Sequence, residues 1–145
     1  MKLYQHVLVA VDLHANCDNR VIERAKAIAE ASQAKMSLVH AVEHINAYGV
    51  AEAYSAVLDV EEQMIAEAKR QPSNLVKEFG IPEPQQHLEV GSPKSVILSK
   101  MKELKIDLIV VGSHGRHGLQ LLLGSTANAI LHHSAVDVLA VRVQE

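Results

Sequence analysis

The chain has 145 residues, 48% of them hydrophobic, which fits a single domain over residues 1–145 with one core. Its formal net charge of −3 and its 3% of aromatic residues argue against a nucleic-acid partner, because they offer neither a basic surface nor a stacking platform. The single cysteine, Cys17, excludes an internal disulfide. No signal peptide is recognisable, and no apolar run approaches the roughly 20 residues that span a bilayer, so we expect a cytoplasmic protein without a membrane partner.

Short apolar runs alternate along the chain with segments of helical spacing. The predicted strands cover residues 6–12, 36–42, 86–90, 106–111 and 136–143, and the predicted helices cover residues 21–31, about 53–79, 93–104 and 125–133. Pro72 interrupts the second helix, so we expect a kink or break near residues 69–71. The alternation predicts an α/β fold whose mostly parallel sheet is covered by helices on both faces.

Two local patterns refine this assignment. Ser92 and Pro93 have the residue types of an N-cap and a first helical position, so they predict the start of the third helix. The strand at 86–90 has alternating character between strong turn signals, which places it near an edge of the sheet.

A glycine-rich turn follows the fourth strand, and it is the chain's most informative motif. Gly112-Ser113-His114-Gly115 is followed by Gly118 and then by Gly124-Ser125-Thr126, where the next helix begins. Free amides and two hydroxyls suit a phosphate, although an ordinary glycine-rich connection explains the pattern about equally well. Asp12 ends the first strand, so Asp12 and the glycine-rich turn are both expected at the carboxyl ends of strands, where ligands of parallel sheets bind. The alternative interpretation of Asp12 is that its carboxylate caps the next helix.

These residues also carry a family resemblance that covers the whole chain. The strand 6–12, Leu38-Val39-His40-Ala41, Gly91-Ser92-Pro93, the 112–126 loop and Asp137-Val138-Leu139-Ala140-Val141 together resemble a single-domain universal stress protein. The resemblance implies a flavodoxin-like, doubly wound three-layer sandwich with a five-stranded parallel sheet in the order 3-2-1-4-5. It also implies a homodimer, and a role in regulation or stress tolerance more than a defined reaction.

The nucleotide-binding branch of that family has Gly-x2-Gly, nine residues, and then Gly-Ser/Thr. This chain keeps every glycine and hydroxyl, but residues 116–123 make its spacer one residue shorter. A tighter loop can crowd a γ-phosphate, so the sequence does not decide whether the bound adenine nucleotide is ATP, ADP or AMP. Ala10 replaces a proline sometimes found in the first strand of the family.

Carried over to this chain, the resemblance assigns the nucleotide to named positions. Asp12 would lie near the ribose or a nucleotide-bound divalent cation such as Mg²⁺, and Ala41 would meet the adenine edge. The ribose and phosphates would meet Gly112, Gly115, Gly124, Ser125 and Thr126. Valine at Gly115 is expected to block the approach of the ligand to the backbone.

Other polar residues have competing interpretations. Arg116 is weighed equally as a phosphate contact and as a solvated loop residue, whereas His117 fits the solvated alternative better. His40 is expected to be a structural histidine, and His132 and His133 to interact with a helix C-terminus rather than with a metal. Cys17 lacks a paired base, so a catalytic role is not expected.

Three function classes remain. The first is a nucleotide-binding regulatory protein, which acts through a protein partner that the sequence does not identify. The second is a slow ATPase or nucleotide-transfer enzyme, and the third is a nucleotide-free dimeric interaction module. The first is favoured, with little or no turnover and no catalytic residue assigned, because neither a P-loop lysine nor a general base is evident. The apolar strand at 136–143 predicts an edge that pairs with a second copy, which proline at Leu139 should disturb.

Overall fold

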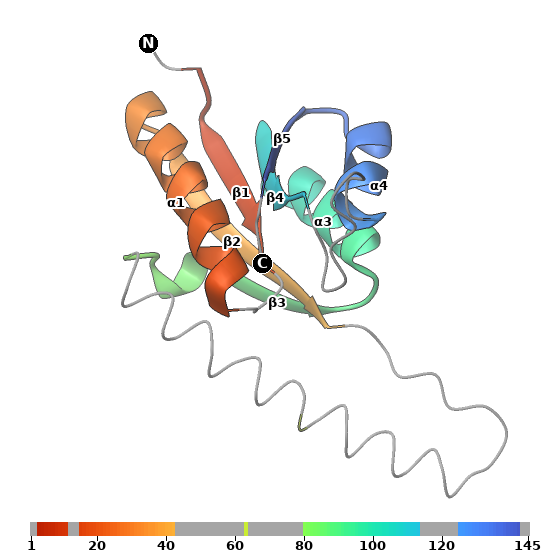
Figure 1. Cartoon of the computed structure of the whole chain (residues 1–145). Coiled ribbons are helices and arrows are strands. Elements are labelled where there is room, and N and C mark those ends of the chain that lie inside the picture. The colour runs from red at the N-terminus through yellow and green to blue at the C-terminus, as the bar shows by residue number, and fades with distance from the viewer. Residues whose placement is uncertain (1–2, 12–14, 43–62, 64–79, 114–124, 143–145) are drawn as a thin grey trace, which may run out of the picture.

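Five parallel strands form one sheet in the order β3-β2-β1-β4-β5 (Figure 1). The computed structural model describes residues 3–11, 15–42, 63, 80–113 and 125–142. The elements are β1 (His6–Ala10), α1 (Ala15–Ser32), β2 (Lys35–Val42), η1 (Glu83–Gln85), β3 (Gln86–Val90), α3 (Pro93–Glu103), β4 (Leu108–Gly112), α4 (Ser125–His133) and β5 (Asp137–Val141). The predicted α/β class and strand order are confirmed, as is the edge position of β3.

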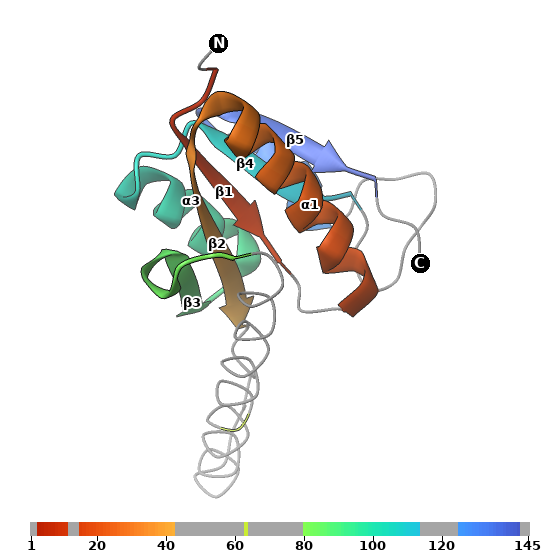
Figure 2. The same cartoon turned by 90° about the vertical axis from the view of Figure 1, so that its left-hand side faces the viewer.

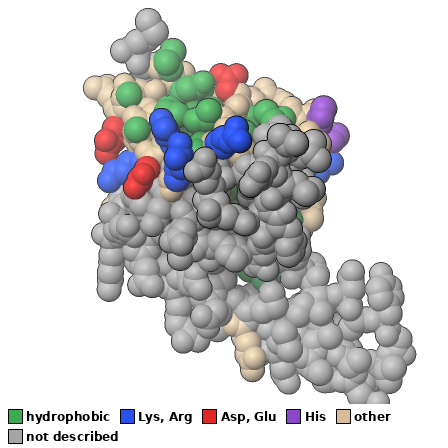
Figure 3. All heavy atoms as spheres, in the orientation of Figure 1, with side chains coloured by type: hydrophobic (Ala, Val, Ile, Leu, Met, Phe, Trp, Pro, Cys, Tyr) green, Lys and Arg blue, Asp and Glu red, His purple; other side chains and the backbone are tan. Residues whose placement is uncertain are grey.

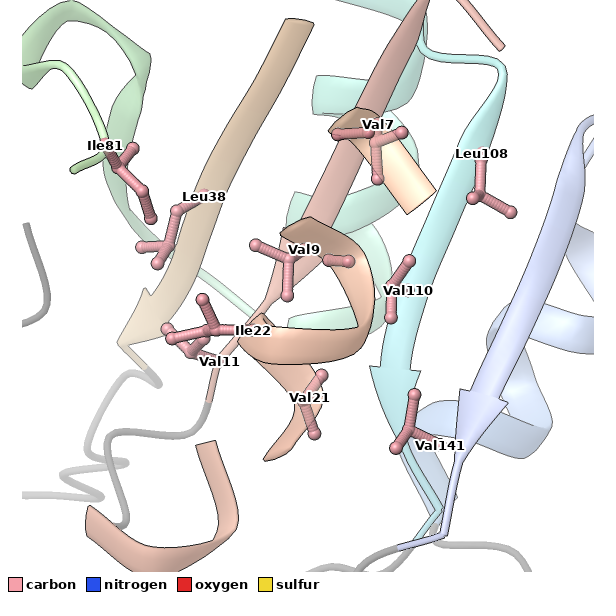
Figure 4. Packing of buried hydrophobic residues seen from close by; sticks show 12 residues of the cluster. Val7, Val9, Val11, Val21, Ile22, Leu38, Ile81, Leu108, Val110 and Val141 are labelled. Carbon is pink, nitrogen blue, oxygen red and sulfur yellow. The ribbon is translucent and has the colours of Figure 1, made fainter. Parts of the chain in front are cut away.

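The sheet separates two helical layers, with α1 on one face and α3 and α4 on the other (Figures 1 and 2). Side chains alternate between the two faces along each strand, so each strand contributes to both layers of the core. Val7 and Val9 belong to the cluster under α1, whereas Leu8 belongs to the cluster under α3 and α4. Figure 4 shows Val21 and Ile22 of α1 packed against the first of these clusters. The core therefore has two halves, one on each face of the sheet.

Helix and strand bounds differ from the prediction where polar or capping residues override apolar spacing. The first helix begins at Ala15 rather than at residue 21, because its first turns carry polar residues that have no apolar period. The fourth strand begins at Leu108, because Ile106 belongs to the end of α3: its amide donates to Met101 O at 2.9 Å, and Lys105 has φ 54°. This arrangement is a Schellman motif. The other ends agree within one or two residues.

The predicted start of α3 is confirmed. Ser92 is the N-cap, with Pro93 at the first helical position, and the amide of Ser95 donates to the Ser92 hydroxyl at 3.4 Å. Helix α4 spans the predicted residues. The second helix predicted near 53–79, including the kink at Pro72, lies outside the described residues.

Strand β5 forms the other edge of the sheet, and its ladder with β4 fixes which amides face outward. Gly112 pairs with Val141, and the amide of Ser113 donates to Val141 O at 2.8 Å. In a parallel ladder, this register directs the backbone amides and carbonyls of Val141 and Leu139 toward β4. The amides of Val138 and Ala140 therefore face the outer edge of the sheet. Leu139 is therefore the wrong position at which to probe the outer edge, because proline there removes a donor that holds β5 in its own sheet.

A buried histidine joins three segments at the amino end of the sheet. His6 Nδ1 lies 3.1 Å from Leu104 O, and His6 Nε2 lies 2.7 Å from the Ser37 hydroxyl. A carbonyl only accepts, so Nδ1 carries the proton and Nε2 accepts from Ser37. Burial lowers the pKa of His6, and burial followed by the charge of Lys100 lowers that of His87. The folded protein therefore favours the neutral form of both imidazoles.

We expect the protein to lose stability in mild acid. The unfolded chain takes up protons at these two histidines below pH about 6.5, where the folded state resists protonation, so the free energy of unfolding falls as pH falls through that window. Urea unfolding at pH 7.5 and 5.5 measures this loss. His6→Gln should reduce the dependence on pH, whereas His132→Gln, at an exposed position on α4, should not. An equal dependence in His6→Gln and the wild type would contradict the assignment.

Candidate functional site

The order of the strands reverses direction at β1, which lies between β2 and β4. In open parallel sheets, ligands bind outside the carboxyl ends of the strands at such a switch point. Here the ends of β1 and β4 bring Val11 beside the stretch that leads into Gly112 and Ser113. Residues about 100 positions apart in the chain thus meet at one edge of the sheet.

Two hydrogen bonds fix the end of β1 against β2. The amide of Val11 donates to Val39 O at 3.0 Å, and His40 Nδ1 lies 2.9 Å from Val11 O. Because that carbonyl can only accept, Nδ1 of His40 is the donor. The expected structural role of His40 is confirmed, and its effect is to hold the point from which the chain continues to Asp12.

Small residues line the carboxyl edge of the sheet. Ala10, Ala41 and Ala140 are half-buried on the face that carries α3 and α4. Gly112 is half-buried at the end of β4 and points, by alternation, to the face that carries α1. Ala41, Ala10 and Gly112 thus place residues without bulk on the adjacent strands β2, β1 and β4, an arrangement that suits close approach of a flat ligand to the backbone.

The start of α4 contributes the electrostatic part of this region. Its first turn contains Ser125 and Thr126, Thr126 is half-buried, and no acidic residue lies in that turn. The first amides of a helix have no partner within the helix, and its N-terminus carries partial positive charge. At α3, by contrast, Ser92 already caps the helix. The N-terminus of α4, with no acidic residue in its first turn, therefore offers positive potential to an anion.

The structure describes some of the residues predicted for the site. Ala41, Gly112 and the starting turn of α4, with Ser125 and Thr126, lie toward the carboxyl edge. The other predicted residues lie outside the described part of the chain: Asp12, Gly115, Arg116, His117 and Gly124. The sequence did not single out the hydroxyl of Ser113, which the structure shows to be buried. The face of the sheet on which this hydroxyl lies follows from the register of β4, and the sequence alone does not contain that register.

The described histidines form no metal centre. His132 and His133 are exposed in the last turn of α4, and Figure 3 shows histidine side chains together on that part of the surface. Within residues 3–11, 15–42, 63, 80–113 and 125–142, no group of three or more His, Cys, Asp or Glu side chains could hold a metal ion. In the same residues, no helix is both long and apolar enough for a membrane span.

Comparisons with a family model and with known proteins both identify the same family. Residues 3–142 match the model of the universal stress protein family. Universal stress protein A homolog 2 of Coxiella burnetii is 44% identical over 144 residues, which are 99% of this chain and 99% of that protein.

Solved structures agree with this match. The universal stress protein UspA from Lactobacillus plantarum is 26% identical, with a TM-score of 0.74 over 97% of this chain and 98% of its own. A universal stress protein solved in complex with cAMP is 32% identical, with a TM-score of 0.60 over 95% of this chain and 96% of its own.

Proposed function

The chain belongs to the universal stress protein family, and from that premise we propose that it is a regulatory protein that binds an adenine nucleotide with little or no turnover. The observation that carries the proposal is the combination of small residues at the switch point with a start of α4 whose first turn has no acidic residue. A flat base and ribose need close approach to the backbone, and phosphates need donors and positive potential. Both needs are met at one edge of the sheet.

The proposed contacts place the base and ribose against the small residues and the phosphates at the start of α4. Ala41 meets the adenine, Gly112 meets the ribose, and the phosphates meet Ser125 and Thr126. Gly115 and Gly124 add main-chain donors, and Arg116 and His117 add positive charge. Asp12 is assigned to the ribose or to a nucleotide-bound Mg²⁺.

The relative solved with cAMP supports the chemical class of the ligand. Like ATP, ADP and AMP, cAMP joins adenine, ribose and phosphate, so one arrangement of small residues and helix amides suits them all. The shortened spacer at 116–123 favours ligands with fewer phosphates. We therefore expect AMP or ADP to bind at least as well as ATP.

Low turnover follows from what phosphoryl transfer requires. Catalysis needs an oriented nucleophile and charges that stabilise the transition state, and the motif lacks the lysine of a P-loop after Gly124. We expect ATP hydrolysis near the roughly 10⁻⁴ per second of GTPases whose charge stabilisation is incomplete.

We extend the proposal to a homodimer through β5. This edge strand has half-buried Val138, Leu139 and Ala140, and Val138 and Ala140 turn their amides outward. An unprotected apolar edge is an aggregation hazard, and pairing with a second copy about a twofold axis would cover it.

Isothermal titration of ligand-free protein with ATP, ADP, AMP and cAMP tests the proposed function. We expect saturable binding of at least one of them, one per chain, and phosphate release from ATP in the same samples near the background rate. Absence of heat at millimolar ligand would favour the interaction-module alternative. Several turnovers per second, lost in Asp12→Ala, would favour the enzyme.

A further inference from the structure

The hydroxyl of Ser113 is buried without a hydrogen-bond partner. Ser113 is 7% exposed, and among the described residues its Oγ is the buried side-chain nitrogen or oxygen that no donor or acceptor satisfies. Buried polar groups are normally paired, and leaving one unpaired costs free energy. By contrast, the hydroxyl of Ser37, also buried, is paired with His6 at 2.7 Å. An exception of this kind calls for a physical reason.

The register of β4 indicates where this hydroxyl points. The ladder with β5 continues to the amide of Ser113, which donates to Val141 O at 2.8 Å. By alternation its side chain lies on the same face as Val111, and Val111 packs in one cluster with Ala127 of the first turn of α4. The hydroxyl therefore lies on the side of the sheet that carries the first turn of α4.

The surroundings of Ser113 favour an anion as the missing partner. The first amides of α4 are donors, yet none of the described ones donates to Ser113. No acidic residue in that turn attracts a cation. A buried hydroxyl without a partner, on the side of the sheet that carries the N-terminus of α4, lacks an acceptor. A phosphoryl group supplies acceptor oxygens to hydroxyls and to helix N-termini alike.

From this geometry we infer that Ser113 is a specificity-determining residue, whose hydroxyl donates a hydrogen bond to a phosphate oxygen of the nucleotide. The inference rests on the proposed function and extends it. The hydroxyl discriminates phosphorylated ligands from the bare nucleoside, because adenosine has no phosphate oxygen to accept its proton. In the absence of ligand, the same hydroxyl contributes nothing to stability.

The test compares Ser113→Ala with wild type by titration with AMP, ADP and adenosine. We expect affinity for AMP and ADP to fall about tenfold or more, the usual effect of losing a donor to a charged group, and affinity for adenosine to stay unchanged. The melting temperature without ligand should stay the same or rise. Ser37→Ala is the matched control: it removes a paired buried hydroxyl, so it should lower the melting temperature and leave the preference for AMP over adenosine intact.

Each other outcome overturns a stated part of the inference. If Ser113→Ala binds AMP as tightly as wild type does, or weakens adenosine equally, the hydroxyl does not contact a phosphate. A melting temperature lowered as far as in Ser37→Ala would show that the hydroxyl is a structural partner instead. If wild type itself binds neither nucleotide nor nucleoside, the proposed function fails, and that result is distinct from the other two.

Discussion

Replacing Gly112 with valine is expected to weaken binding of adenine nucleotides roughly a hundredfold or more while leaving the fold intact. Gly112 ends β4, pairs with Val141, and is absent from the described residues that have positive φ. Its backbone conformation is therefore open to any residue, and valine is favoured in strands. Glycine at this position supplies space rather than a special backbone angle. An isopropyl group there would occupy the room assigned to the ribose.

Calorimetry and circular dichroism on Gly112→Val separate the two effects. The matched control is Ala135→Val, which adds bulk at an exposed position between α4 and β5, away from the carboxyl edge. The control should bind as wild type does. Unchanged affinity in Gly112→Val would exclude the ligand from the end of β4, and loss of the helical signal would mean that the glycine is structural.

Proline at Ala140 is expected to convert the proposed dimer into monomers. Ala140 turns its amide to the free edge of β5, so proline removes a donor available to the second copy and spares the ladder with β4. Proline is tolerated on edge strands for this reason. Light scattering at micromolar concentration should report a dimer of 15.8 kDa chains for wild type and a monomer for Ala140→Pro.

Leu139→Pro supplies the matched comparison for this prediction. Leu139 bonds inward, toward β4, so proline there should lower the melting temperature of the domain itself. A dimer that persists in Ala140→Pro would place the contact on another surface, and a monomeric wild type would remove the contact altogether.

Local patterns in the sequence were enough to predict the α/β class and most of the helices and strands that the structure describes. Apolar runs such as the one around Val7 and Val9 indicate strands, because buried parallel strands are apolar on both faces. Ser92 and Pro93 indicate a helix start because capping is a local interaction. The strand order, however, came from a family resemblance, since it depends on contacts between distant parts of the chain.

Other features depend on geometry that local patterns do not encode. Gln33 and Lys105 end α1 and α3 at positive φ, although neither is a glycine or asparagine that would signal such an end. Whether Leu139 or Ala140 faces outward depends on the register of β5 with β4. The burial of Ser113 likewise depends on contacts between segments and not on its neighbours in the sequence. Each of these features needed three-dimensional structure.

Native mass spectrometry of the wild-type protein, incubated in turn with millimolar AMP, ADP and ATP, tests the central claim most directly. The account predicts a dimer of 15.8 kDa chains that carries one adenine nucleotide per chain, with adenosine triphosphate remaining unhydrolysed when it is the ligand. A spectrum that shows only ligand-free chains with every nucleotide would contradict the account.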